Sequence, residues 1–186
     1  MTIFKRILEA QERLGKAHGD ALSPEEKESF RLAIDALWFV WTNGQADEFA
    51  DYRKDADVDA PARVVAAFNT REEAEAWLSA NPKPPNSAYV LIADEYHLVM
   101  CSRERGIRAL APHPTLEFHL DELMRDGLPP AVAAFHTREE AEAWLASQAA
   151  PPAEAVIQIG GEHFLAVYYR NINHRALFPF SRVNRP

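Results

Sequence analysis

A segment of 48 residues occurs twice in this chain, because Val65–Pro112 recurs without a gap as Val132–Pro179. The copies are identical at 24 of these 48 positions, and 13 of the identities fall in the first fourteen, where VAAFNTREEAEAWL is followed later by VAAFHTREEAEAWL. One such unit leaves a sheet face and a helix stripe uncovered. Two units can cover each other, so the duplication restricts the chain to folds in which two like modules close one core.

Each copy predicts a strand, a capped helix and two further strands. In the first copy the apolar run 63–68 is followed by Thr70 at an N-cap position, with Glu73 placed to complete a capping box. A proline-rich break ends the helix, and the alternating runs 88–93 and 96–102 predict strands. The second copy repeats these steps at 131–135, Thr137 with Glu140, 155–159 and 163–169, with a tight turn at Gly160-Gly161.

The first sixty residues predict helices. One covers 3–17, and a second begins after Ser23, which is followed by Pro24 and Glu26 as an N-cap signal. Its apolar residues recur at helical spacing and predict a buried face: Phe30, Ile34, Leu37, Trp38 and Trp41. A short third helix is expected over 45–54.

The predicted fold class is therefore α+β: an N-terminal α-hairpin followed by two tandem (α)β-α-β-β repeats related by a pseudo-twofold axis, with mostly antiparallel sheet. The expected regions are a helical segment 1–60, a first repeat with a connecting helix over 61–128, and a second repeat with a basic tail over 129–186. We expect them to pack as one compact unit.

The composition is acidic, with a formal net charge of −8 over 186 residues. An acidic chain repels phosphate backbones and attracts basic surfaces, so we expect a basic protein partner and no nucleic acid. The first twenty residues carry frequent charges and no long apolar run, from which we expect neither a signal peptide nor a membrane partner. The single cysteine, Cys101, fits a reducing cytoplasm better than a disulfide framework.

The sequence predicts no catalytic residue, cofactor or metal site. It contains no GxSxG, P-loop or GxGxxG pattern and no closely spaced Cys or His ligand set. His119 and Glu122 share a helix face, but a di-iron site would need a second such pair. Cys101 lies in an apolar strand, where a thiol usually packs as a small hydrophobe.

Two surfaces are candidate partner-binding sites. The first is an acidic patch on and after the third helix: Asp47, Glu48, Asp51, Asp55, Asp57 and Asp59. The second is an aromatic and basic hairpin exit in the second copy: Tyr168, Tyr169, Arg170, His174 and Arg175. Tyr and Arg are frequent interface anchors. A solvated linker and an ordinary strand exit are the alternative interpretations of these two segments.

The phrase AAFxTREEAEAWL resembles the strand and capped helix of several small α/β modules, including the N-terminal nucleic-acid-binding module of some RNase H proteins. The basic and aromatic sheet residues of that module have no counterparts in Ala88–Ser102. As a type, an acidic duplicated α+β chain without catalytic motifs is similar to bacterial immunity proteins and to orphan proteins of phage-like elements.

These observations favour a non-catalytic protein-binding module, most concretely an immunity-type inhibitor that occludes a toxin or another basic protein. The first alternative is a structural or assembly protein of a phage-like element that self-associates through sheet edges. The second is an enzyme that uses a His/Tyr/Arg cluster near His174, which predicts a concave pocket around those side chains.

Overall fold

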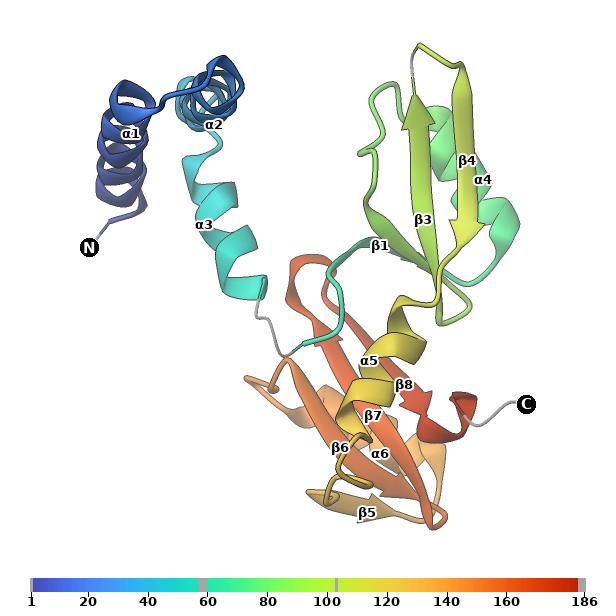
Figure 1. Cartoon of the computed structure of the whole chain (residues 1–186). Helices are drawn as coiled ribbons and strands as arrows, with labels where there is room; N and C mark the ends of the chain where they lie inside the picture. Colours follow the sequence, from blue (N-terminus) through green and yellow to red (C-terminus); the bar gives the residue numbers. More distant parts are fainter. Residues whose placement is uncertain (1, 57–59, 103, 184–186) are drawn as a thin grey trace. The chain divides into compact units, whose positions relative to one another are not determined.

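The computed structural model describes residues 2–56, 60–102 and 104–183, and the chain divides into two compact units (Figure 1). The helical unit, Met1–Asp57, contains α1 (Ile3–Asp20), α2 (Pro24–Thr42) and α3 (Ala46–Asp55). The repeat unit, Val58–Pro186, contains both copies of the duplicated segment. No helix in the described part of the chain combines the length and apolar character needed to cross a membrane.

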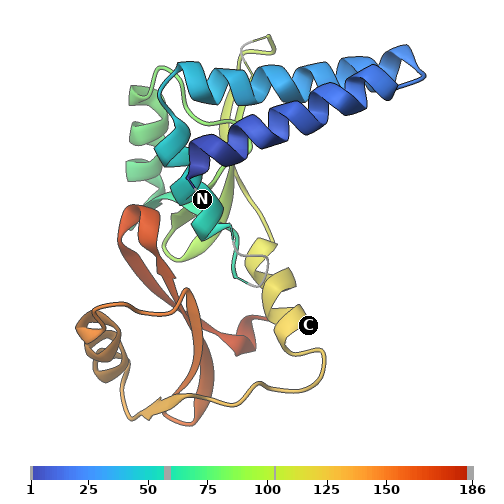
Figure 2. The same ribbon diagram turned by 90° about the vertical axis from the view of Figure 1, so that its left-hand side faces the viewer.

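In the helical unit, α1 and α2 lie side by side and α3 contacts both (Figure 2). The predicted start of α2 is confirmed, because the Ser23 hydroxyl accepts the Glu26 N–H at 3.1 Å and the Glu26 carboxylate accepts the Ser23 N–H at 3.3 Å. The helix ends where Gly44 adopts a φ of 70°, which glycine tolerates without strain.

The expectation that α2 buries one face is wrong. None of its side chains is buried, and Trp38 is 49% exposed. The indoles still cluster: Trp41 packs against Phe4 at 5.2 Å between ring centroids and against Trp38 at 6.4 Å. A three-helix unit offers α2 only helices as neighbours, so the face that the sequence predicts as core is half-covered.

The repeat unit contains two four-stranded sheets of the same topology. The first has the order β1 (Val64–Phe68), β2 (Tyr89–Ile92), β3 (Glu95–Ser102), β4 (Ile107–Pro112), and the second has the order β5 (Ala133–Phe135), β6 (Glu154–Ile159), β7 (Glu162–Tyr169), β8 (His174–Pro179). In each, the first two strands are parallel and the remaining pairs antiparallel. The predicted α+β class with mostly antiparallel sheet is confirmed.

Each copy contains one strand more than the sequence predicts. The segments after the two hairpins, interpreted from sequence as strand exits and a basic tail, form β4 and β8. The pattern of β4 is weak because it lies at a sheet edge, and Leu110 is its one buried residue. An edge strand that faces solvent can carry polar residues on both sides, so its periodicity does not stand out.

The near-identical front halves of the copies build the same local structure twice. Helices α4 (Arg71–Ala80) and α6 (Arg138–Ser147) connect the parallel strands. Thr70 accepts the Glu73 N–H and Thr137 accepts the Glu140 N–H, each at 3.3 Å, as the sequence predicts. The Glu73 carboxylate completes the capping box by accepting the Thr70 N–H, whereas the Glu140 carboxylate accepts the His136 N–H instead. The Phe–Trp pair behind each cap is likewise reproduced, with ring centroids 5.6 Å apart in the first copy and 5.5 Å in the second.

The two faces of each sheet bury different residues because side chains alternate along a strand. One face of the first sheet packs on α4 through Val90, Ile92 and Val99, and one face of the second packs on α6. The other faces share a central core with α5 (Thr115–Leu123), whose buried members are Val64, Leu91, Tyr96, Leu116, Leu120, Leu165, Val167, Tyr169, Ala176, Phe178 and Phe180. The two copies therefore close one core together.

Candidate functional site

The predicted acidic patch is partly described by the structure. Asp47, Glu48 and Asp51 are exposed on α3, and Asp51 pairs with Lys54 at 2.7 Å. Asp55 is the last residue of α3, and Asp57 and Asp59 lie outside the described residues. At 100° per residue, the three described acids fall within about 100° of one another around the helix axis, so they occupy one face.

The predicted aromatic and basic hairpin exit does not form one surface. Tyr168 pairs across the strands with Arg175, and Tyr169 pairs with His174, so alternation sends the two pairs to opposite faces of the sheet. On one face the Arg175 guanidinium lies 4.6 Å from the Tyr168 ring centroid, and on the other Tyr169 is buried in the central core. Arg170 is exposed in the short 3₁₀ turn between the strands.

Arg175 has a structural explanation that the first copy shares. Its Nε donates to the Leu145 carbonyl in the last turn of α6 at 3.1 Å. In the first copy Arg108 donates to the Asn81 carbonyl at the end of α4. Helix ends leave carbonyls without intrahelical partners, and a cation there also complements the helix dipole. These arginines therefore fasten β4 and β8 to their helices.

His174 lies in a cavity of about 520 Å³ between the two copies, and the cavity also contains Asp94. The His174 Nε2 is 3.8 Å from Asp94 Oδ1, and Arg138 Nη2 is 3.6 Å from Asp94 Oδ2. Asp94 and Ala93 form the β2–β3 turn with φ of 60° and 49°, where the second copy has Gly160 and Gly161. A non-glycine residue in this conformation costs about 1 kcal/mol, so the duplication has diverged here toward a strained turn.

The residues that lie near His174 differ from those of the predicted His/Tyr/Arg cluster. Tyr169 and His174 meet, with stacked rings 6.2 Å apart, whereas Asp94 and Arg138 come from segments that the sequence analysis did not select. Arg182 also reaches this turn and donates to the Asp94 carbonyl at 2.9 Å. Only the tertiary packing of the two copies brings residues 94, 138 and 174 together.

A buried pair of phenols joins the copies beside this cavity. The Tyr96 hydroxyl donates to the Ala62 carbonyl at 2.8 Å, so at the 2.6 Å contact between the two phenols the Tyr169 hydroxyl is the donor. Burial raises the pKa of both hydroxyls above the ordinary value of 10. The phenols are therefore neutral hydrogen-bonding groups of the core and stay protonated at physiological pH.

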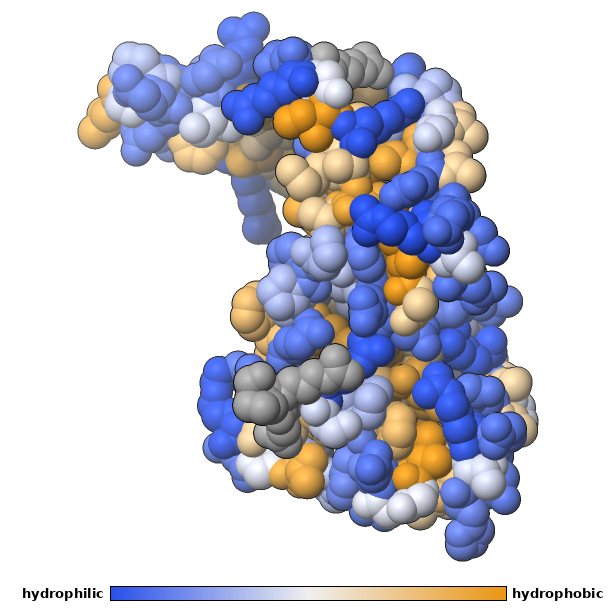
Figure 3. Space-filling model, turned by 90° about the vertical axis from the view of Figure 1, so that its right-hand side faces the viewer, coloured by the Kyte–Doolittle hydropathy of each residue, from blue (hydrophilic) through white to orange (hydrophobic). Residues whose placement is uncertain are grey.

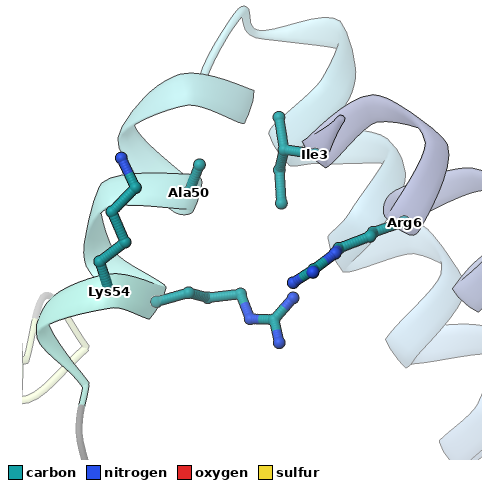
Figure 4. Close-up of a pocket in the computed structure, with 5 residues that line it drawn as sticks. Ile3, Arg6, Ala50 and Lys54 are labelled. Carbon is teal, nitrogen blue, oxygen red and sulfur yellow. The ribbon is translucent and has the colours of Figure 1, made fainter. Parts of the chain in front are cut away.

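The helical unit contains a basic hollow of about 360 Å³, lined by Ile3, Arg6, Ala50, Arg53 and Lys54. Figure 4 shows Arg6 extending from α1 toward α3, and the Lys54 side chain running along α3 with its amine pointing away from Arg6. The Arg6 and Arg53 side chains make no hydrogen bond or ion pair with any residue that the structure describes, whereas Lys54 pairs with Asp51. The basic hollow could not be predicted from the sequence, because the α1 residues that line it are 44 or more positions from the α3 residues.

A second apolar surface lies on α2, away from the Trp face. Leu32, Ala36 and Phe39 follow one another at i, i+4 and i+7, and Leu32 and Phe39 are 68% and 60% exposed. We call these three residues the α2 stripe. Glu28 and Asp35 are exposed on the same side of the helix. Hydrophobic residues also show at several places on the largely hydrophilic surface in Figure 3.

The two residues considered as metal ligands, His119 and Glu122, pair with other side chains. His119 pairs with Glu154 at 2.7 Å, and Glu122 pairs with Arg125. The Cys101 N–H donates to the Asn86 side chain at 2.8 Å within a strand. Among the described residues, no three His, Cys, Asp or Glu side chains gather as a metal site would require.

Comparisons of the chain with protein-family models, with curated proteins and with solved structures find no match.

Proposed function

We propose that this protein is a non-catalytic binding module that docks the α2 stripe into an apolar groove on a basic protein partner. The observation that carries the proposal is the exposure of Leu32 and Phe39 at i and i+7 on a helix that buries none of its side chains. A helix that is apolar on more than one side normally lies among several neighbours. Insertion into a groove by residues spaced i, i+4 and i+7 is a common way for a helix to bind a protein.

The charge around the α2 stripe supports a basic partner. Glu25, Glu28 and Asp35 are exposed on this side of α2, and the acidic face of α3 belongs to the same unit. Complementary charge at the rim of an interface accelerates encounter and selects the partner. An immunity-type inhibitor of a toxin, acting in the cytoplasm where Cys101 stays reduced, is the most concrete form of this proposal.

Replacing Leu32 and Phe39 together by alanine is expected to weaken partner binding by about 100-fold or more. Each side chain contributes about 1.5–3 kcal/mol when it is fully buried in an interface. The measurement compares proteins from the native lysate retained by wild-type and variant columns, followed by titration of the purified partner. Leu8→Ala, at a 51% exposed apolar position on α1, is the matched control and should retain the partner.

Three outcomes would contradict this proposal. Loss of the partner with Leu8→Ala would show that nonspecific hydrophobic contacts, and not the α2 stripe, retain the partner. A concentration-dependent dimer in sedimentation velocity that disappears in the Leu32/Phe39 variant would assign the stripe to self-association, which is the assembly alternative. Slow hydrogen exchange of the stripe without any partner would mean that the rest of the chain already covers it.

Reversing the two acids beside the stripe, Glu28→Lys with Asp35→Lys, is expected to lower the association rate by about tenfold at low salt. Rim charges act mainly on the rate of encounter, and salt screens them over a Debye length of about 10 Å at 0.1 M. Stopped-flow association at increasing salt should bring the wild-type and variant rates together. The matched control is Glu104→Lys with Glu72→Lys, which reverses two exposed acids of the repeat unit and changes the net charge equally. If the control slows association equally, the effect comes from the net charge of the protein and not from Glu28 and Asp35 in particular.

One observation favours the enzyme alternative. A cavity lies beside His174, the one member of the predicted cluster that lines it, and it places this histidine 3.8 Å from a carboxylate. Catalytic pairs in unliganded proteins are often longer than a hydrogen bond. The same carboxylate also faces Arg138, and its backbone carbonyl accepts from Arg182, contacts that join the two copies. We therefore assign Asp94 first to the junction of the copies and rank catalysis below binding.

A further inference from the structure

The basic hollow of the helical unit is electrostatically unbalanced. Three cationic residues, Arg6, Arg53 and Lys54, line one concavity in a chain whose net charge is −8, and of these the Lys54 ammonium is paired with Asp51. Arg6 and Arg53 are exposed, and neither is neutralised by a described residue. Two positive charges held close together repel each other. An anion bound between them attracts both, and this attraction offsets the repulsion.

Arg6 is also placed against the dipole of its own helix. The first turn of α1 contains no acidic residue, and Lys5 and Arg6 lie in it, at the end where unpaired N–H groups carry partial positive charge. Arg53 and Lys54, by contrast, lie in the last turn of α3, where cations are favoured. The hollow therefore combines two cations that the fold stabilises with one that it opposes, beside a helix end that itself attracts anions.

We propose that the basic hollow binds the phosphate group of a small, soluble phosphomonoester. The two guanidinium groups, Arg6 and Arg53, offer paired N–H donors that match phosphate oxygens, and each carries a permanent positive charge. The volume of about 360 Å³ exceeds what a phosphate alone fills and lies within the range of small-molecule sites. Ile3 and Ala50 supply apolar wall for the organic part of the ligand.

The test is an NMR titration of the full-length ¹⁵N-labelled protein with inorganic phosphate at low ionic strength. We expect saturable shifts in the first turn of α1 and the last turn of α3. Arg6→Gln combined with Arg53→Gln should weaken binding by about tenfold or more, and Arg53→Lys, which retains the charge, by less. Arg13→Gln with Arg31→Gln is the matched control, because it removes the same charge from the same unit outside the hollow.

A sugar phosphate should bind more tightly than inorganic phosphate, and the unphosphorylated sugar should not bind. Shifts that never saturate, or equal weakening in the Arg13/Arg31 control, would overturn the proposal in favour of general charge attraction. Binding to vesicles that contain phosphatidic acid tests whether the phosphate group belongs to a lipid headgroup and not to a soluble molecule. Vesicle binding that requires Arg6 and Arg53, without saturable binding of free phosphate, would overturn the soluble ligand. The Leu32/Phe39 variant should bind phosphate as the wild type does. The phosphate proposal and the α2 stripe proposal can therefore be tested independently.

Discussion

Replacing Phe178 by alanine is expected to lower the free energy of unfolding of the repeat unit by about 3–5 kcal/mol. Phe178 is fully buried in the central core, where it contacts Tyr96 at 6.5 Å between ring centroids and lies 5.8 Å from the Arg182 guanidinium. Because this core is shared by both sheets and α5, a cavity there weakens the contact between the copies as well as the second sheet. A loss of this size is a large fraction of the roughly 5–15 kcal/mol that stabilises a typical domain.

Urea unfolding followed by far-UV circular dichroism and tryptophan fluorescence measures this loss. Phe118→Ala is the control, because Phe118 lies on α5 and is 64% exposed, so its removal should cost less than about 1 kcal/mol. The helical unit is a separate compact unit, and its transition should stay unchanged in both variants. A loss below about 1.5 kcal/mol for Phe178→Ala would show that the central core does not hold the copies together.

Raising the pH above 10 is expected to destabilise the repeat unit through Tyr96 and Tyr169. Burial raises the pKa of both phenols above the value of 10 that applies to the unfolded chain. Well below pH 10 both phenols are protonated in the folded and the unfolded state, so they add no pH dependence to the stability. Above it the unfolded state loses protons first, so the free energy of unfolding falls by about 1.4 kcal/mol per pH unit for each phenol, or about 2.7 for the pair.

Tyr169→Phe should reduce this slope by about half and leave the Tyr96 hydrogen bond to Ala62 intact. At neutral pH the same variant should cost about 0.5–1.5 kcal/mol, because one hydrogen bond is lost. The measurement is urea unfolding at several pH values from about 8 to about 11, with Tyr52→Phe, a 47% exposed tyrosine of the helical unit, as the control. A variant slope equal to that of the wild type would show that Tyr169 ionises normally in the folded chain.

Local features of the fold could be predicted because neighbouring residues specify them. The hydroxyls of Ser23, Thr70 and Thr137 each accept the backbone N–H three positions on, so all three predicted caps are confirmed. The strands β4 and β8 could not be predicted in the same way, because an edge strand owes its conformation to the partner strand beside it. Their polar residues were therefore interpreted as an exit and a tail.

The candidate sites show the same difference between local sequence relations and long-range packing. The sequence selected Tyr169 and His174 as neighbours in one hairpin, and they do meet. It could not select Asp94 as their companion, because that residue lies 80 positions before His174 and approaches it only where the copies pack. The basic hollow is likewise formed by α1 and α3, whose residues have no local relation in sequence.

The amino-acid sequence by itself determined the duplicated unit, the capped helices, the α+β class and the acidic charge, because each depends on composition or on residues within a few positions. Tertiary structure decided which copy supplies which side chain to the shared core and which faces remain open. Asp94 and Gly161 occupy equivalent positions in the two copies, yet only Asp94 faces a histidine of the other copy. Side chains far apart in the chain acquire a common environment only when long-range packing brings their elements into contact.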